Sequence, residues 1–186
     1  LHNIHGYYLN YRVLFEYLAR TDIPVVWTLH DCWSFTGHCS YFAFAECDKY
    51  KNRCDYCPQI GSYPRALFWD NSRNNFLLKK ELFTSLGSKL TLVPVSQWLA
   101  SAVRESFFSD TAIQVIYNGV DTGVFYPHDA EDIRRKYCIE DKKVILGVAS
   151  PWSPRKGYDD FVELRSHLPD NYVIVLIGLS QKQIKK

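Results

Sequence analysis

Several features are absent from this sequence of 186 residues, and each absence excludes a class of protein. No apolar run approaches the roughly 20 residues that a membrane-spanning helix needs. Residues 1–5 lack the basic and apolar regions of a signal peptide, so we expect a soluble, cytoplasmic protein. The 22 Lys and Arg against 20 Asp and Glu leave a net charge of +2 with no dense basic block, which argues against nucleic acid as a partner. Methionine is also absent, so the chain has no initiator residue, and we expect a fragment.

Hydrophobic and aromatic residues are plentiful. A hydrophobic content of 47% suffices to bury a core in a chain of this length, so the chain is predicted to be globular. Aromatic residues make up 16%, and many of them stand among polar residues. That arrangement suits clefts that stack on ring-shaped ligands, although packing in the core accounts for most of them.

Strand and helix patterns alternate along the chain, which predicts an α/β fold with parallel sheets. Short apolar runs rich in β-branched residues predict strands that are buried on both faces, and apolar residues at helical spacing predict helices. The predicted strands are 24–29, 89–95, 112–117, 143–148 and 171–177. The predicted helices are 7–19, 66–86, 97–107, 129–137 and 158–168, and Ser96 is the predicted N-cap of the third.

Two irregular stretches divide this pattern. The polar segment 121–141 lies between two strand–helix units and predicts a boundary between domains 1–125 and 126–186. The segment 32–64 keeps no period and is rich in cysteine, so we expect an insertion with its own internal constraint.

In open parallel sheets, ligands bind at the carboxyl ends of the strands. One such end carries His30 and Asp31, and an imidazole there can exchange a proton near neutral pH, although a structural hydrogen bond explains it equally well. Another strand end carries Arg155 and Lys156 directly before a predicted helix. Cations and the free N–H groups of a helix N-terminus suit a diphosphate there. The alternative is that Arg155 and Lys156 are an ordinary solvated pair of cations.

Four cysteines, Cys39, Cys47, Cys54 and Cys57, fall within 19 residues. The last two have the spacing that places two thiolates on one tetrahedral ion, so the cluster predicts a structural zinc site, with His38 as a substitute for one ligand. Two disulfides or free thiols are the alternatives. The proline that directly follows Cys57 argues against a thioredoxin-type redox motif, because such a pair of cysteines opens a helix. The two remaining cysteines, at 32 and 138, are expected to be small buried residues.

Four segments together resemble a known family: His2-Asn3-Ile4-His5-Gly6-Tyr7-Tyr8, the stretch from Thr28 to Cys39, Asn118-Gly119-Val120-Asp121, and Lys156-Gly157. They resemble the glycosyltransferase family 4 enzymes of bacterial capsule and exopolysaccharide synthesis, particularly the colanic-acid type. The resemblance covers nearly the whole chain. The stretch from Thr28 to Cys39 with the cysteine cluster is specific to that group, whereas the other motifs are widespread.

The resemblance implies the GT-B fold, in which two Rossmann-like domains handle the acceptor and the nucleotide-sugar donor. It implies a retaining, hexosyltransferase-type enzyme without a catalytic metal. The acceptor would be a saccharide or a lipid-linked saccharide, and the enzyme would touch the inner membrane peripherally. This chain would hold the later part of the acceptor domain and the start of the donor domain, and would be inactive alone. A GT-B phosphorylase or epimerase, and a zinc-stabilised binding module, are the alternatives.

The resemblance also assigns roles to residues. His30, with Asp31, would lie in the cleft beside the donor sugar, and Lys156 would neutralise the donor diphosphate. Asn118 and Gly119 would form the turn that leads from the first domain to the second. Many members have a Gly-Arg pair early in the donor loop, where this chain has Gly147-Val148-Ala149-Ser150, so Arg155 would supply the second cation.

Overall fold

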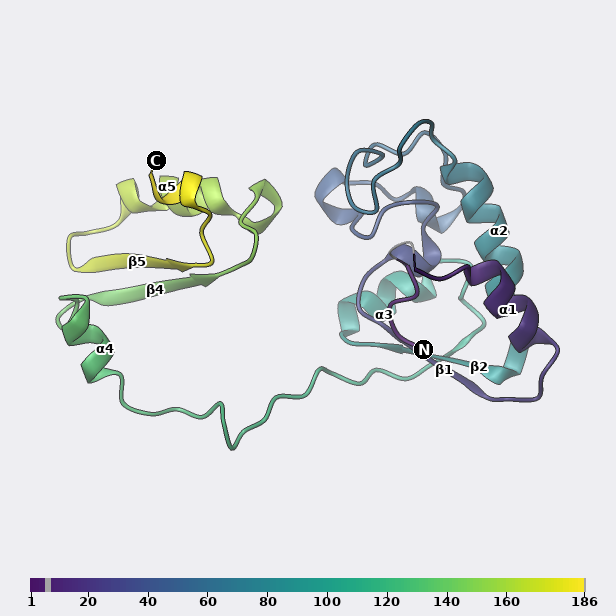
Figure 1. Ribbon diagram of the computed structural model, residues 1–186, viewed down its shortest axis with the longest axis horizontal. Coiled ribbons are helices and arrows are strands. Elements are labelled where there is room, and N and C mark those ends of the chain that lie inside the picture. The colour runs from purple at the N-terminus through teal and green to yellow at the C-terminus, as the bar shows by residue number, and fades with distance from the viewer. Residues whose placement is uncertain (6–7, 186) are drawn as a thin grey trace. The chain divides into compact units, whose positions relative to one another are not determined.

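The computed structural model describes residues 1–5 and 8–185, and the chain forms two compact units, Leu1–Val120 and Asp121–Lys186 (Figure 1). The division falls a few residues before the boundary that the polar stretch predicts. Each unit is built on a parallel sheet, with order β1-β2-β3 in the first unit and β4-β5 in the second. The predicted α/β class with parallel sheets is confirmed.

The sheet of the first unit consists of β1 (Val25–Leu29), β2 (Leu90–Pro94) and the short β3 (Ala112–Ile113). Beyond β3, the N–H groups of Gln114 and Ile116 still donate to carbonyls of β2, so the chain continues alongside the sheet as a looser strand. The prediction that β1 is buried on both faces is wrong, because Val26 is 56% exposed. Only one face of β1 is therefore fully buried, the face that carries Val25, Trp27 and Leu29.

Three helices accompany this sheet: α1 (Tyr11–Ala19), α2 (Ser72–Thr84) and α3 (Gln97–Arg104). The side chain of Asn10 accepts hydrogen bonds from the first N–H groups of α1, and Ser96 caps α3 as predicted. Lys89 donates to three carbonyls at the end of α1, where the last carbonyls of a helix lack their regular intrahelical partners.

Helix α2 begins six residues later than the pattern predicts, since residues 66–71 form a loop. The carboxylate of Asp70 accepts from the N–H of Ser72 at 2.8 Å and from the N–H of Cys57 at 2.7 Å. These bonds hold the loop in a turn that competes with the first helical turn.

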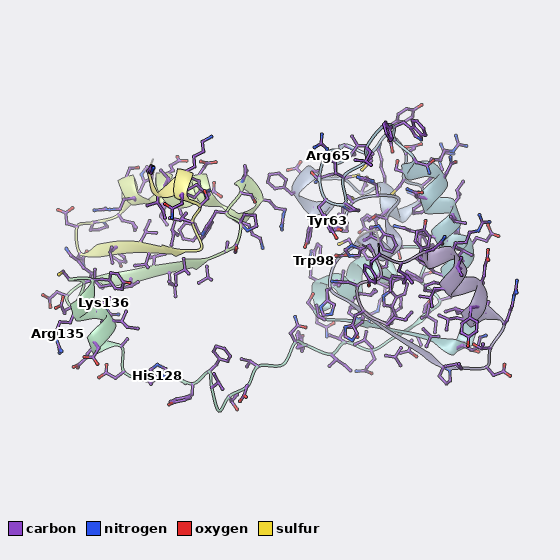
Figure 2. All side chains as sticks on the ribbon, viewed as in Figure 1. Tyr63, Arg65, Trp98, His128, Arg135 and Lys136 are labelled. Atoms are coloured by element: carbon purple, nitrogen blue, oxygen red, sulfur yellow. The ribbon has the colours of Figure 1, made fainter. Side chains whose placement is uncertain are left out.

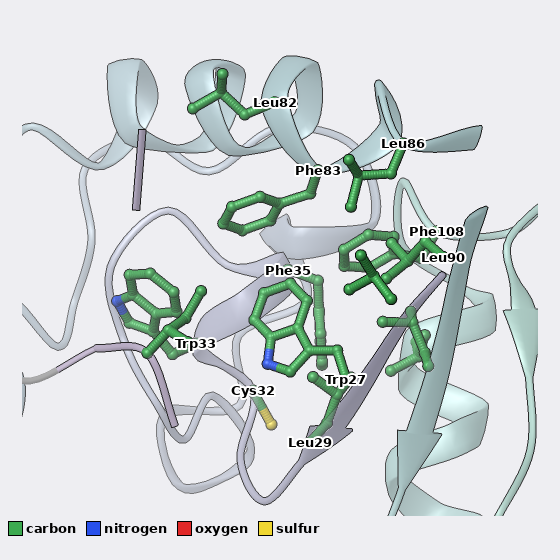
Figure 3. Close-up of a cluster of buried hydrophobic side chains, with 14 of the residues drawn as sticks. Trp27, Leu29, Cys32, Trp33, Phe35, Leu82, Phe83, Leu86, Leu90 and Phe108 are labelled. Atoms are coloured by element: carbon green, nitrogen blue, oxygen red, sulfur yellow. The ribbon is translucent and has the colours of Figure 1, made fainter. Parts of the chain in front are cut away.

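Aromatic rings from α1, β1 and α2 form the centre of the core of the first unit. Figure 3 shows Trp27 of β1 and Phe83 of α2 among the buried side chains. Phe83 packs against Phe15 with ring centroids 4.4 Å apart and meets Trp27 edge-on at 5.0 Å. The indole N–H of Trp27 donates to the carbonyl of His2 at 2.9 Å. This bond fastens the N-terminal segment to the sheet.

The predicted insertion between β1 and α2 contains only three short 3-10 turns among its described residues, Trp33–Phe35, Ala43–Ala45 and Lys49–Lys51. It packs on the remainder of the unit through aromatic stacking. Phe42 stacks on Tyr50 at 4.2 Å and on Trp98 of α3 at 5.7 Å. Trp98 is labelled in Figure 2.

The second unit pairs β4 (Lys143–Val148) with β5 (Tyr172–Ile177) and contains α4 (Glu131–Lys136), α5 (Tyr158–His167) and α6 (Gln181–Ile184). Cys138 follows α4 with a left-handed backbone, φ 53°, and is exposed, so the prediction that it is buried is wrong. Cys32 is buried as predicted. Within the described residues, none of the helices combines the length and the hydropathy that crossing a membrane requires.

Candidate functional site

The carboxyl end of β1 gathers histidines from two parts of the sequence. The N-terminal segment runs beside the strand, because the N–H of Thr28 donates to the carbonyl of Leu1 at 2.9 Å. His2 consequently lies next to His30, with its Nδ1 3.2 Å from His30 Nε2 and the two rings stacked. His30 itself is exposed at the edge of the sheet.

The second histidine of the N-terminal segment, His5, is held on both ring nitrogens. Its Nε2 lies 2.8 Å from Oδ2 of Asp31, and its Nδ1 lies 3.3 Å from the hydroxyl of Tyr63. The other oxygen of Asp31 accepts from the N–H of Trp33 at 2.9 Å. Both side chains of the His5–Asp31 pair are nearly buried, at 9% and 11% exposed, so the carboxylate fixes the orientation of the imidazole in a low-dielectric site.

A cavity of about 460 Å³ opens beside this pair, within the size range of small-molecule sites. His5 lines it, together with Tyr11, Trp33, Arg65 and Lys79. Arg65 lies two residues beyond Tyr63, directly after the insertion (Figure 2). The cavity therefore presents aromatic faces, an oriented imidazole and basic side chains on one surface. This combination of groups suits a polyhydroxy ligand.

The rim of the cavity is apolar. Leu67, Phe68 and Trp69 line it and are 82%, 86% and 75% exposed. Three consecutive large apolar side chains in water are uncommon outside binding surfaces. They belong to the loop that the sequence pattern assigned to a helix.

Lys79 reaches the cavity from α2, and its amine is buried. Its Nζ donates to the carbonyls of Trp33 at 2.7 Å and Thr36 at 3.0 Å, and it lies 3.4 Å from the centre of the Trp33 ring. Burial lowers the pKa of Lys79 well below its usual value, while the nearby Cys54, Cys39 and Asp31 oppose that shift. No ion pair joins Lys79 to a carboxylate among the described residues.

The four clustered cysteines line one small cavity of about 10 Å³. All are free thiols. A hydrogen bond from the Cys39 thiol lowers the pKa of Cys57 to about 7, and the N–H of Gln59 donates to the same sulfur. Burial raises the pKa of Cys54 to about 11. In the described part of the chain, no group of three or more His, Cys, Asp or Glu side chains is placed as a ready set of metal ligands.

The predicted donor-binding residues are exposed. Arg155 and Lys156 end a 3-10 turn, and Gly157 follows with a left-handed backbone, φ 75°, before α5 begins. Asp159 and Asp160 stand in the first turn of α5, where they already face its positive end. Asn118 and Gly119 lie in exposed coil at the end of the first unit.

The structure thus brings His30 and Asp31 to the same strand end, but it is His5 that connects this end to the large cavity. Sequence reasoning placed His5 only within a resembling motif and gave it no role. The sequence shows only that His2 and His5 lie three residues apart. No local pattern indicates that this segment contacts a strand about 25 residues further along the chain.

Comparisons with known proteins agree with this arrangement. The model of Glycosyltransferase Family 4 matches residues 1–124. The chain is 32% identical over 127 residues to a protein of Escherichia coli (strain K12) described as "Putative colanic acid biosynthesis glycosyl transferase WcaC", covering 64% of this chain and 30% of that protein. The fold resembles that of Anabaena HepE, crystallised in complex with UDP, with a TM-score of 0.52, 21% identity and coverage of 87% of this chain and 36% of that one.

The chain spans about a third of the length of each of these two proteins. The likeness to HepE confirms the predicted Rossmann-like parallel sheets of the GT-B type. The family match covers most of the chain and includes the histidine cluster, the cysteine cluster and the large cavity. This chain belongs to glycosyltransferase family 4.

Proposed function

We propose that this chain is part of an enzyme that transfers a sugar from a nucleotide-sugar donor to a saccharide acceptor in polysaccharide biosynthesis. The observation that carries the proposal is the 460 Å³ cavity beside the His5–Asp31 pair, inside the segment that matches the family. Its aromatic and cationic lining suits a sugar. In this proposal the first unit binds the acceptor.

The reaction breaks the bond between the anomeric carbon and the diphosphate, and the acceptor oxygen forms the new bond to that carbon. The proton of the acceptor hydroxyl leaves with the diphosphate, and a retaining outcome keeps the anomeric configuration. We propose that Lys156 and Arg155 neutralise the departing diphosphate, while His30 hydrogen-bonds the donor sugar and Asp31, bound to His5, belongs to the same site. Positioning and electrostatic stabilisation then lower the barrier without a catalytic metal.

The test is a transfer assay with the intact protein that contains this chain, using a panel of nucleotide sugars that carry hexoses. Lys156→Ala should weaken transition-state or donor binding by about 1.5–3 kcal/mol, because it removes one charge-assisted contact. The matched control is Lys136→Ala, which removes an exposed cation of α4 in the same unit. Equal activity of the two variants would reject the role of Lys156.

We further propose that the acceptor is lipid-linked and that the protein touches the membrane peripherally. The support is the exposed Leu67, Phe68 and Trp69 rim, which would cover the lipid portion beside the saccharide site. Replacing all three by serine should abolish sedimentation with vesicles of phosphatidylglycerol and phosphatidylethanolamine and should raise KM for a lipid-linked acceptor more than for a water-soluble one. Unchanged sedimentation would reject the membrane contact.

A further inference from the structure

The cysteine cluster is not used by the proposed reaction, and it lies in a segment that has little regular secondary structure. The insertion has no strand and no α-helix among its described residues, yet it forms a wall of the large cavity through Gly37 and His38. Loops of this length without regular structure need an additional constraint. Disulfides do not supply it, since the cysteines are free.

The backbone of the insertion is shaped around the sulfur atoms. The N–H of Gly37 donates to the sulfur of Cys54, and the N–H of Gln59 donates to the sulfur of Cys57. Tyr56, between these two cysteines, has a left-handed backbone with φ 43°, and its side chain is 86% exposed. The turn therefore directs the two thiols inward and the ring outward, and N–H donors of this kind stabilise sulfur in its anionic form.

The cysteines surround a small cavity. All four cysteines line the cavity of about 10 Å³, which has room for about one water-sized sphere. His38 lines the same cavity, is 8% exposed, and its Nε2 has no hydrogen-bond partner among the described residues. An unpaired buried nitrogen is costly, and a metal ion or a metal-bound thiolate would provide its missing partner.

A second and independent observation is the burial of the Lys79 amine. This side chain is 1% exposed and forms no ion pair with a carboxylate in the described residues. Burial lowers the pKa of Lys79, while Cys54, Cys39 and then Asp31, which is already bound to His5, oppose that shift. A buried lysine keeps its charge only beside an anionic partner, and a zinc ion bound by four thiolates carries a net negative charge.

We propose that Cys39, Cys47, Cys54 and Cys57 bind one Zn²⁺ and that the resulting anionic centre is the counter-charge of the buried Lys79. Because the sulfurs are not placed as a ready ligand set, binding draws the insertion together, and metal binding is coupled to the order of the loop. The centre would then hold the wall of the 460 Å³ cavity, since Lys79 also binds the carbonyls of Trp33 and Thr36. This proposal is independent of the transfer reaction.

The first experiment measures zinc by inductively coupled plasma mass spectrometry in the purified intact protein, together with its mass under denaturing, non-reducing conditions. We expect about one zinc per chain and the mass of fully reduced cysteines. Protein without zinc, whether with free thiols or with a mass lowered by two hydrogens per disulfide, would overturn the proposal.

Variants identify the ligands. Cys54→Ser and Cys57→Ser should lose most of the bound zinc, whereas Cys138→Ser, at an exposed position of the second unit, should retain it. If the ligand variants do not fold, wild-type protein treated with a chelator and then with Co²⁺ should develop thiolate-to-cobalt charge-transfer absorption, which added Zn²⁺ should remove. Absence of that absorption, or zinc retention by both ligand variants, would refute the site.

The counter-charge is tested separately. Lys79→Met should lower zinc affinity about 10–100-fold, as the loss of a supporting outer-shell group typically does. Lys80→Met, an exposed neighbour on the same helix, is the matched control and should leave the affinity unchanged. Chelation should also accelerate tryptic cleavage after Arg53 in the insertion. Equal zinc affinities of the two lysine variants would overturn the role of Lys79.

Discussion

The His5–Asp31 contact should be a strong stabilising interaction of the first unit, and a double-mutant cycle can measure it. The two side chains meet at 2.8 Å and are only 9% and 11% exposed, so solvent screens the contact little. A hydrogen bond to a charged group is worth about 1.5–3 kcal/mol, and we expect a coupling free energy in that range. Asp31→Ala also removes the acceptor for Trp33 N–H, but that loss cancels within the cycle.

The assay is urea unfolding of wild type, His5→Ala, Asp31→Ala and the double variant at neutral pH, followed by tryptophan fluorescence. All four proteins carry Trp152→Phe, because this removes the one tryptophan of residues 121–186 and makes the signal report on the first unit. Arg12 and Glu16 on α1 provide a control cycle. Their side chains are 61% and 45% exposed at 3.0 Å, and we expect about 0.2–1 kcal/mol there. A His5–Asp31 coupling no larger than the control would refute this reasoning.

Further predictions concern the strand end at His30, the insertion and the core. His30→Ala in the intact enzyme should lower turnover by about 10²–10³ with little loss of stability, because His30 is exposed; full turnover in the transfer assay would leave it a structural role only. Gly37→Ala should destabilise the insertion by about 1–3 kcal/mol, because an added Cβ would lie 2.8 Å from Cys54 Cβ and clash with the carbonyl of Ser72. Thermal unfolding measures this loss, and an unchanged midpoint would contradict it. Phe83→Ala should lower the free energy of unfolding by about 3–5 kcal/mol, because the fully buried ring packs between Phe15 and Trp27. Urea unfolding measures this, and a loss below about 1 kcal/mol would show that the core collapses into the space left by the ring.

The secondary structure was largely readable because its signals are local. The apolar run 143–148 predicted β4 to the residue, and Ser96 marked the start of α3, since capping involves groups only a few positions apart. Helix α2 departed from its pattern because Asp70 binds both Ser72 and the distant Cys57, and a local period cannot register that second bond. The exposed face of β1 depends likewise on which elements cover the sheet.

The candidate site was readable only in part. Sequence pattern pointed to His30 and Asp31 because polar residues at the end of an apolar run stand out in a parallel sheet. The partner of Asp31 was decided by the tertiary structure, since the backbone pairing of the N-terminal segment with β1 is what brings His5 within 2.8 Å across 26 positions. Spacing likewise predicted the cysteine cluster, whereas the buried Lys79 beside it became visible only when α2 packed against the insertion, because burial of a charge is a property of the folded chain.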